Sequence, residues 1–221
     1  MDSSILFSIR LSLQVAAVAT LFTIIVGIAI AYLLARKDFI GKEALDVLFT
    51  LPLVLPPTVT GYYLIVLFGR NGLIGKWIYL WTGWSIMFTW YAAVLASFIV
   101  ALPLMIKTTR AAIESVDRNL IRASQTLGHT EFETAVKVIL PLAGRGLVAG
   151  AVLSFARAIG EFGATLMIAG NIPGRTNTMP ITIYSLAASG EGGKANGMVL
   201  ILTLMSGVFI YLANRYARRI I

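Results

Sequence analysis

The stretch "RASQTLGHTEFETAVKVILPLAG", residues 122–144, is a polar segment of helical pattern in a chain that is otherwise apolar. It carries charges of both signs, so it is too polar to insert into lipid. Gly128 interrupts it, and a glycine just past a helix end commonly supplies the left-handed residue that stops the helix. The stretch is therefore predicted to form two helices joined by a glycine corner.

Residues around the corner predict where these two helices begin. Asp117 can cap a short first helix, while Thr130 and Glu133 fit a capping box that begins the second helix, which runs toward Pro141. The first helix is too short to be stable in water by itself. The segment from about 117 to 141 is therefore expected to be held either by a partner protein or against its own bundle and the lipid headgroups.

The composition as a whole indicates a membrane protein. Hydrophobic residues make up 58% of the chain and charged residues 13%, with a mean hydropathy of +0.85, whereas soluble domains have about 45–50% apolar and about 25% charged residues. There is no cysteine, and His129 is the one histidine. Disulfides, thiolate chemistry and a histidine-built metal centre are therefore excluded, and no catalytic or metal-binding residue is expected.

Five apolar regions reach the length of about 20 residues that a membrane helix needs. We predict an all-α polytopic membrane protein with five transmembrane helices, in which residues 1–221 form a single transmembrane domain. The expected spans are residues 11–35, 47–69, 84–106, 146–169 and 195–214.

The basic residues predict the orientation of these spans. With the N-terminus outside, twelve of the 18 lysines and arginines lie in cytoplasmic segments, five lie outside and Arg157 lies within a span. Cytoplasmic loops carry this excess, so the C-terminus and the segment 117–141 are placed in the cytoplasm. The net charge of +8 then reflects the basic cytoplasmic loops of a multi-pass membrane protein, and no nucleic-acid partner is expected.

The second span carries prolines at positions 52, 56 and 57. Each removes a backbone donor and bends the helix, and the freed carbonyls must face other helices or a water-filled path. An architectural kink and a gating hinge are both compatible with this pattern. The candidates for lining a path just past the kink are Thr58, Thr60 and Gly61.

Arg157 and Glu161 lie four residues apart in the fourth span, so they can meet on one face of a helix. Arg157 could attract an anion, or the two charges could neutralise each other and fix the packing of the helix. A transported anion must also leave, and a strong unpaired cation would trap it. We therefore favour a structural or gating role for the pair.

The segment "ASQTLGHTEFETAVKVILPL" resembles the cytoplasmic EAA loop of ABC-transporter permeases, with Arg122 where that family usually has glutamate. Ala123 and Ser124 match the family's alanine pair, Gly128 its glycine, and the run ending at Pro141 its closing motif. In the family, this loop docks into a groove of a separate ATPase subunit. The residues that the resemblance implies for coupling are Leu120, Arg122, Ala123, Ser124, Leu127, Gly128, Glu131 and Pro141.

Two further segments, residues 51–75 and 154–184, resemble molybdate permeases, and they contain "LPLVLPPTVTGYYL" and "RAIGEFGATLMIAGNIPGRTNTMP". The resemblance implies a type I permease fold and a homodimer that imports molybdate across the bacterial inner membrane. It also implies two ATPase subunits, which carry the ATP and magnesium, and an extracytoplasmic molybdate-binding protein. Tungstate, sulfate and thiosulfate are alternative cargoes. An outer loop is expected either to dock the binding protein or to be an ordinary connector, and its docking candidates are Arg175, Thr176, Asn177 and Thr178.

The chain itself lacks the phosphate loop of an ATPase, G-x-x-x-x-G-K-[ST]. The nearest imitation, "RNGLIGKW", has Arg70 in place of the first glycine and Trp77 in place of the hydroxyl residue. A secondary transporter or channel would be expected to show several intramembrane acids or inverted repeats. The spans hold one acid, Glu161, and no repeat. We therefore expect a permease subunit that is not an enzyme and has no cofactor of its own.

Overall fold

The computed structural model describes residues 3–219, and throughout this range the regular structure is helical. Short turns join most of the helices. Their bounds are α1 (Ser3–Arg36), α2 (Lys42–Val54), α3 (Pro57–Phe68), α4 (Gly75–Thr82), α5 (Trp90–Glu114), α6 (Arg118–Thr126), α7 (Glu131–Thr134), the π-helix η1 (Ala135–Ile139), α8 (Leu140–Leu142), α9 (Gly144–Ile159), α10 (Gly163–Ala169), α11 (Met179–Ala188) and α12 (Gly192–Arg219).

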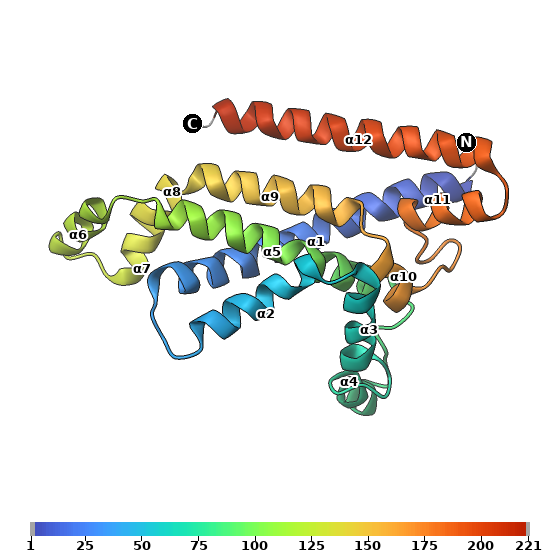
Figure 1. The fold of residues 1–221 in the computed structure, drawn as a ribbon, viewed down its shortest axis with the longest axis horizontal. Helices are drawn as coiled ribbons and strands as arrows, with labels where there is room; N and C mark the ends of the chain where they lie inside the picture. The colour runs from blue at the N-terminus through green and yellow to red at the C-terminus, as the bar shows by residue number, and fades with distance from the viewer. Residues whose placement is uncertain (1–2, 220–221) are drawn as a thin grey trace.

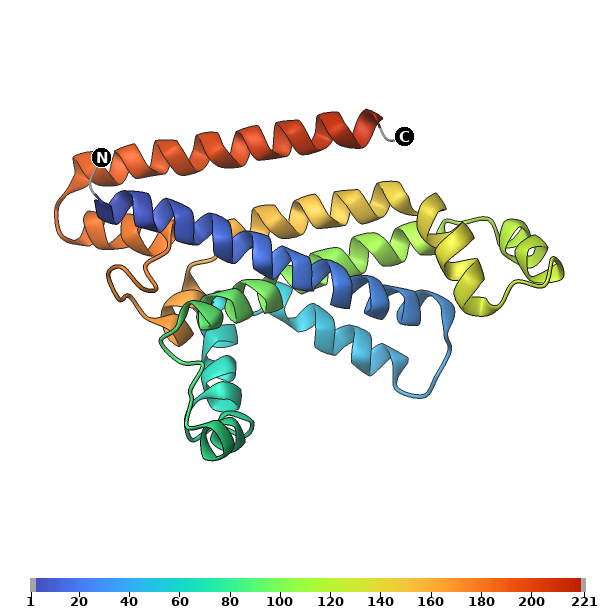
Figure 2. The ribbon, with the colours of Figure 1, turned by 180° about the vertical axis from the view of Figure 1, so that it is seen from behind.

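The long helices α1, α5, α9 and α12 run along the long axis of the molecule (Figure 1). Helices α6 and α7 form one end, whereas α10 and α11 lie toward the other end, where the described part of α1 begins. Helices α3 and α4 project sideways from the body, as the view from behind also shows (Figure 2). The segments that carry function are therefore placed at the two ends and on one side of a helical bundle.

The core of the bundle is the packing of α1 and α9 against α5. A Cβ atom added at Gly27 of α1 would lie 2.7 Å from Cγ of Met105, and one added at Gly150 of α9 would lie 2.9 Å from Sδ of the same methionine. Both glycines therefore let a helix backbone approach α5 closely. Close packing of small residues takes the place of the hydrophobic effect where helices associate in lipid.

Three helices of the described range are long and apolar enough to cross a membrane: α1, α5 and the part of α12 from Gly192 to Ala213. A fourth candidate is the bent pair Glu131–Leu142 and Gly144–Ile159, whose parts meet at 72°.

The other two predicted spans are broken. The region 47–69 is divided into α2 and α3 at its prolines, and the region 146–169 is divided into α9 and α10 around Glu161. The prolines predict the first break, whereas the apolar pattern of residues 146–169 predicts one continuous span, which is wrong because α9 ends at Ile159 and α10 begins at Gly163. The bounds also shift in α5, which begins at Trp90 and continues to Glu114.

Helix α12 lies beside the bundle with little of its surface covered. In its most apolar window only 11% of the residues are buried. Its clearest anchor is Phe209, whose ring stacks on Phe155 of α9 with centroids 3.9 Å apart. An apolar groove of about 440 Å³ remains between the two helices. Lipid or protein is therefore required to cover the rest of this helix.

Candidate functional site

The segment 117–142, called the elbow below, has the helix caps and the glycine turn that its sequence predicts. The Asp117 carboxylate accepts a hydrogen bond from the N–H of Asn119 at 2.8 Å, which caps α6. Gly128 is left-handed, with φ +87°. The Thr130 hydroxyl accepts from the N–H of Glu133 at 3.2 Å, and the Glu133 carboxylate accepts from the N–H of Thr130 at 2.9 Å. The predicted capping box and glycine corner are thus confirmed.

The capping box also fixes the ionisation of Glu133. The backbone hydrogen bond from Thr130, and then the bond from Lys137, lower the pKa of Glu133 to about 2. A carboxylate with a depressed pKa stabilises the folded state above its ordinary pKa, and this contribution is lost as the pH falls toward the lowered value. The carboxylate of Glu133 is therefore ionised at any physiological pH.

Ser124 joins the two limbs of the elbow from inside. Its side chain is 5% exposed, and its Oγ lies 3.0 Å from Nδ1 of His129 and 3.0 Å from the hydroxyl of Thr134. A buried hydroxyl with two partners holds the corner in one shape. No local pattern in the sequence indicates this role of His129, because only the turn at Gly128 brings it back to Ser124.

The second limb widens into the π-helix η1 just before Pro141. A proline clashes with the carbonyl four residues earlier, here that of Lys137, and cannot bond to it. The π-helical turn from Ala135 to Ile139 accommodates this defect. After Leu142 the chain turns by 72° into α9. The elbow is thus joined to α9 through a π-helical turn and then a bend at Ala143.

An apolar hollow of about 410 Å³ opens between the two limbs. Leu127 lies at its edge with 80% of its surface exposed, and Leu120 is 48% exposed. Exposed leucines beside a hollow outside the spans are typical of a protein-binding surface. The lining residues are Leu120, Ala123, Ser124, Leu127, His129, Lys137, Val138, Pro141 and Leu142.

Three predicted coupling residues do not line the hollow, and the first of them, Gly128, forms the corner beside it. Arg122 is exposed and does not line it. Glu131 pairs with Lys37, beyond the end of α1, at 2.7 Å, so it ties the elbow to the bundle. A second tie, between α2 and α5, is made by Asp46, which pairs with Lys107 at 2.8 Å and Arg110 at 3.1 Å.

The two helix breaks lie against each other. A Cβ atom added at Gly163, the first residue of α10, would lie 2.9 Å from Cβ of Pro57 and 3.3 Å from the backbone nitrogen of Thr58. One added at Gly61 would lie 2.9 Å from Cα of Ala164. Interrupted helices that meet within a bundle are where transporters place irregular backbone. Residues about a hundred positions apart in the sequence thus form one candidate site.

Glu161 bridges the break between α9 and α10. Its carboxylate pairs with Arg157 at 2.8 Å and accepts a hydrogen bond from the N–H of Ala164 at 2.8 Å. The side chain of Glu161 is 1% exposed and that of Arg157 is 30% exposed. The carboxylate is therefore buried but satisfied by a cation and by the first turn of α10. This geometry favours the structural or gating role over an open anion site.

The remaining path candidates differ in exposure. Thr58 is exposed, whereas Thr60 is 4% exposed and its hydroxyl has no hydrogen-bond partner within residues 3–219. Gly61 is packed against α10. In this conformation the three residues do not form one open lining.

Most of the predicted docking residues are buried. Thr176, Asn177 and Thr178 are 0%, 6% and 4% exposed. The Thr176 hydroxyl accepts from the N–H of Ile172, and the Asn177 amide donates to Ser8 of α1. They hold the loop against the bundle, and Arg175 is the exposed member of the predicted set.

A bundle with two interrupted helices and a polar elbow defines the membrane component of a transport system. Residues 10–221 match the family described as "Binding-protein-dependent transport system inner membrane component". The chain belongs to this family. Family membership confirms the prediction of a multi-pass transport subunit that is not itself an enzyme.

Similar proteins refine this assignment. The molybdenum transport system permease protein ModB of Haemophilus influenzae is 42% identical over 96% of this chain and 93% of its own. The sulfate transport system permease protein CysT of Escherichia coli is 32% identical over 96% of this chain and 78% of its own. A structure of the MetNI methionine ABC transporter in an inward-facing conformation contains a chain with a TM-score of 0.75 and 19% identity, with full coverage of both chains. The chain therefore has the fold of an ABC importer permease.

We expect the corner at Gly128 to depend on backbone conformation alone, because no atom lies within 4 Å of a Cβ added there. Valine should destabilise the elbow by about 1–2 kcal/mol, since a left-handed conformation is costly for other residues. Asparagine tolerates that conformation better. Limited proteolysis of the purified chain should therefore cut the elbow faster in Gly128→Val than in Gly128→Asn. Equal cleavage of the two variants would contradict this assignment.

Proposed function

We propose that this chain is the pore subunit of an ATP-driven importer of molybdate. The observation that carries the proposal is the higher identity to a molybdenum permease than to a sulfate permease, over nearly the whole chain in both cases. Two copies would form the pore, two ATPase subunits would bind at the elbows, and an extracytoplasmic molybdate-binding protein would deliver the anion. Tungstate is the nearest alternative cargo, followed by sulfate and thiosulfate.

The proposed membrane arrangement has five crossings. They are α1, the broken pair α2 and α3, α5, the pair α9 and α10, and α12. The N-terminus lies outside and the C-terminus in the cytoplasm, as the distribution of basic residues favours. A second copy of the chain is one cover for the exposed face of α12, and Arg175 offers the binding protein a cation at the tip of its loop.

A continuous set of contacts supports mechanical coupling from the elbow to the helix breaks. A side chain of the ATPase seated in the hollow would press on α6 and on the limb formed by η1 and α8. That limb continues through the 72° bend into α9. Glu161 joins the end of α9 to α10, and Gly163 contacts the break at Pro57. A movement of the elbow would therefore reach the proposed path through packed backbone.

Reconstitution tests the proposed cargo and energy source together. Proteoliposomes that contain this chain and its ATPase, with the binding protein outside, should accumulate radiolabelled molybdate only when ATP is supplied inside. Unlabelled molybdate should abolish the uptake of label, whereas an equal excess of sulfate should not. Uptake without ATP would indicate a secondary transporter or channel, and equal competition by sulfate would indicate a general oxyanion importer.

A further inference from the structure

The turn between α3 and α4 is closely packed and hydrogen-bonded. A Cβ atom added at Gly69, Gly72 or Gly75 would lie 2.4, 2.5 or 2.1 Å from a backbone oxygen of the same region. The N–H groups of Leu73 and Ile74 donate back to carbonyls of α3 at 3.1 and 2.8 Å. Backbone therefore packs directly on backbone here. Residues 65–88, called the α3–α4 corner below, present a preformed surface.

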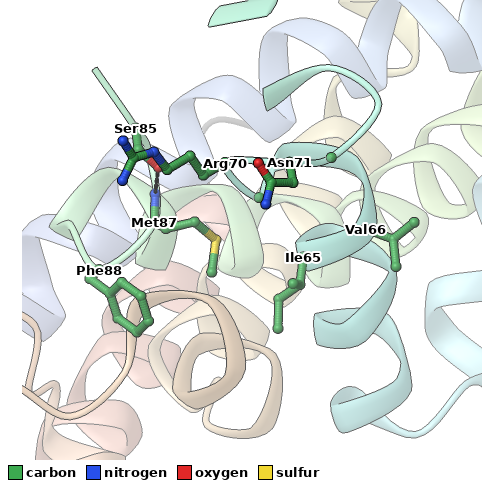
Figure 3. A pocket seen from close by; sticks show the side chains of 9 residues that line it. Ile65, Val66, Arg70, Asn71, Ser85, Met87 and Phe88 are labelled. Atoms are coloured by element: carbon green, nitrogen blue, oxygen red, sulfur yellow. Dashed lines mark hydrogen bonds between the residues drawn. The ribbon is translucent and has the colours of Figure 1, made fainter. Parts of the chain in front are cut away.

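A cavity of about 690 Å³ lies in this corner. Its rim is polar, with the side chains of Arg70, Asn71 and Ser85, and below them lie the apolar side chains of Ile65, Met87 and Phe88 (Figure 3). The site is thus amphipathic, with a cation at one edge and an apolar floor.

The guanidinium of Arg70 is oriented by Tyr79, and this contact leaves its positive charge unbalanced. It lies 4.0 Å from the centre of the Tyr79 ring and donates a hydrogen bond to the Tyr79 hydroxyl. No acidic side chain pairs with it among residues 3–219. An oriented guanidinium matches the geometry of a phosphate group.

The floor of the cavity is fixed by a strained residue. Phe88 has φ +59°, which is rare for a bulky side chain. Its N–H donates to the carbonyl of Ile168 in α10 at 3.1 Å, and its ring packs near Gly170. Such a conformation persists only where contacts with the surrounding structure stabilise it. Residues strained in this way are often found at ligand-binding sites.

Large apolar side chains surround the cavity on the outside. Trp77, Trp81 and Trp84 are 59%, 84% and 44% exposed, and Leu73 is 70% exposed. Tryptophan gathers where a protein crosses from lipid to water. The corner is therefore placed at the edge of the bilayer, with its apolar surface in the acyl region and Arg70 at the level of the headgroups.

We propose that the α3–α4 corner binds a phospholipid, preferably an anionic one. The lipid phosphate lies against Arg70 at the rim, and the upper part of an acyl chain lies on Ile65, Met87 and Phe88. A free oxyanion would have no use for the apolar floor, whereas a phospholipid fits both the cation and the apolar side chains. The assignment is independent of the cargo and of which side of the membrane the corner faces.

The chain carries a built-in reporter for this site. All four of its tryptophans lie in residues 77–90, so native fluorescence reports on the corner and on the adjoining start of α5. Phospholipid with brominated acyl chains quenches tryptophan on contact. The purified chain in detergent micelles is titrated with brominated phosphatidylglycerol and, separately, with brominated phosphatidylcholine.

We expect half-maximal quenching at an about fivefold lower fraction of the anionic lipid, as one basic residue near a membrane surface provides. Arg70→Gln should remove this preference, whereas Arg70→Lys, which keeps the charge, should retain much of it. Arg10→Gln is the matched control, because Arg10 is an exposed arginine at the start of α1. That variant should behave as the native chain.

Four results would overturn the proposal. Equal quenching by both lipids in the native chain shows that no headgroup is recognised, and an equal loss in Arg10→Gln shows only diffuse charge attraction. Relief of the preference by soluble phosphate or molybdate identifies a free anion as the occupant. Tryptophans that no lipid quenches show that protein covers the corner. Thermal unfolding of each variant, measured in parallel, excludes misfolding as the cause.

Discussion

Arg157→Ala is expected to destabilise the chain by on the order of 3 kcal/mol, because it leaves the carboxylate of Glu161 buried without its cation. This is the lower end of the range for buried pairs, since the side chain of Arg157 keeps 30% of its exposure. For a chain of this size the melting temperature should fall by about 6–12 °C. Thermal unfolding of the purified chain in detergent measures the effect.

The matched control is the neutral pair Arg157→Gln with Glu161→Gln. A glutamine at position 161 can still accept the hydrogen bond from Ala164, and no unpaired charge remains. We expect this double variant to be clearly more stable than Arg157→Ala. If Arg157→Ala proves as stable as the double variant, the pair does not stabilise the break.

The charge-reversed variant, Arg157→Glu with Glu161→Arg, tests the same ion pair. An arginine at position 161 cannot accept the N–H of Ala164, so reversal should restore the ion pair but not the cap of α10. The melting temperature of this double variant should therefore lie between that of Arg157→Ala and that of the native chain.

Leu127→Glu is expected to abolish ATP-driven uptake while the chain remains folded. Leu127 is the most exposed leucine at the hollow of the elbow, and a charge placed there would have to be buried against the ATPase. Loss of a central apolar anchor costs about 2 kcal/mol or more, which weakens binding by about 30-fold. Co-purification of the ATPase with this chain, together with uptake in proteoliposomes, measures the loss.

Gln125→Glu places the same charge two residues earlier, in the last turn of α6, but away from the hollow. Gln125 is exposed and does not line the cavity. Uptake and binding of the ATPase should be nearly unchanged in this variant. Equal damage from both substitutions would place the docking surface on a different face of α6, and normal uptake in Leu127→Glu would remove the elbow from the proposed mechanism.

Local signals made the elbow predictable. Asp117, Gly128 and the pair Thr130 and Glu133 act on backbone within a few residues, so their effect does not depend on the rest of the fold. Hydropathy likewise located the long membrane helices, because about 20 apolar residues are needed to cross lipid. Pro56 and Pro57 marked the break of the second span for the same local reason.

The break of the fourth span had no comparable local signal. The residues from Gly160 to Gly163 contain no proline, and the mean hydropathy over about 20 residues stays apolar although Glu161 and two glycines lie here. What separates α9 from α10 is the buried carboxylate of Glu161, held by Arg157 and by Ala164. Hydropathy averages over the segment and cannot detect such a contact.

The sequence by itself determined the long membrane helices α1, α5 and α12 and the helix–corner–helix form of the elbow, because apolar length and capping residues act locally. The class of protein followed from the resemblance of the elbow to the loop of a known family. Tertiary structure alone decided that Gly163 meets Pro57, that Thr176 to Thr178 are buried, and that Arg70 stands over an apolar cavity. These contacts join residues from separate helices and loops. Their formation depends on how the helices pack, and no pattern along the chain encodes that packing directly.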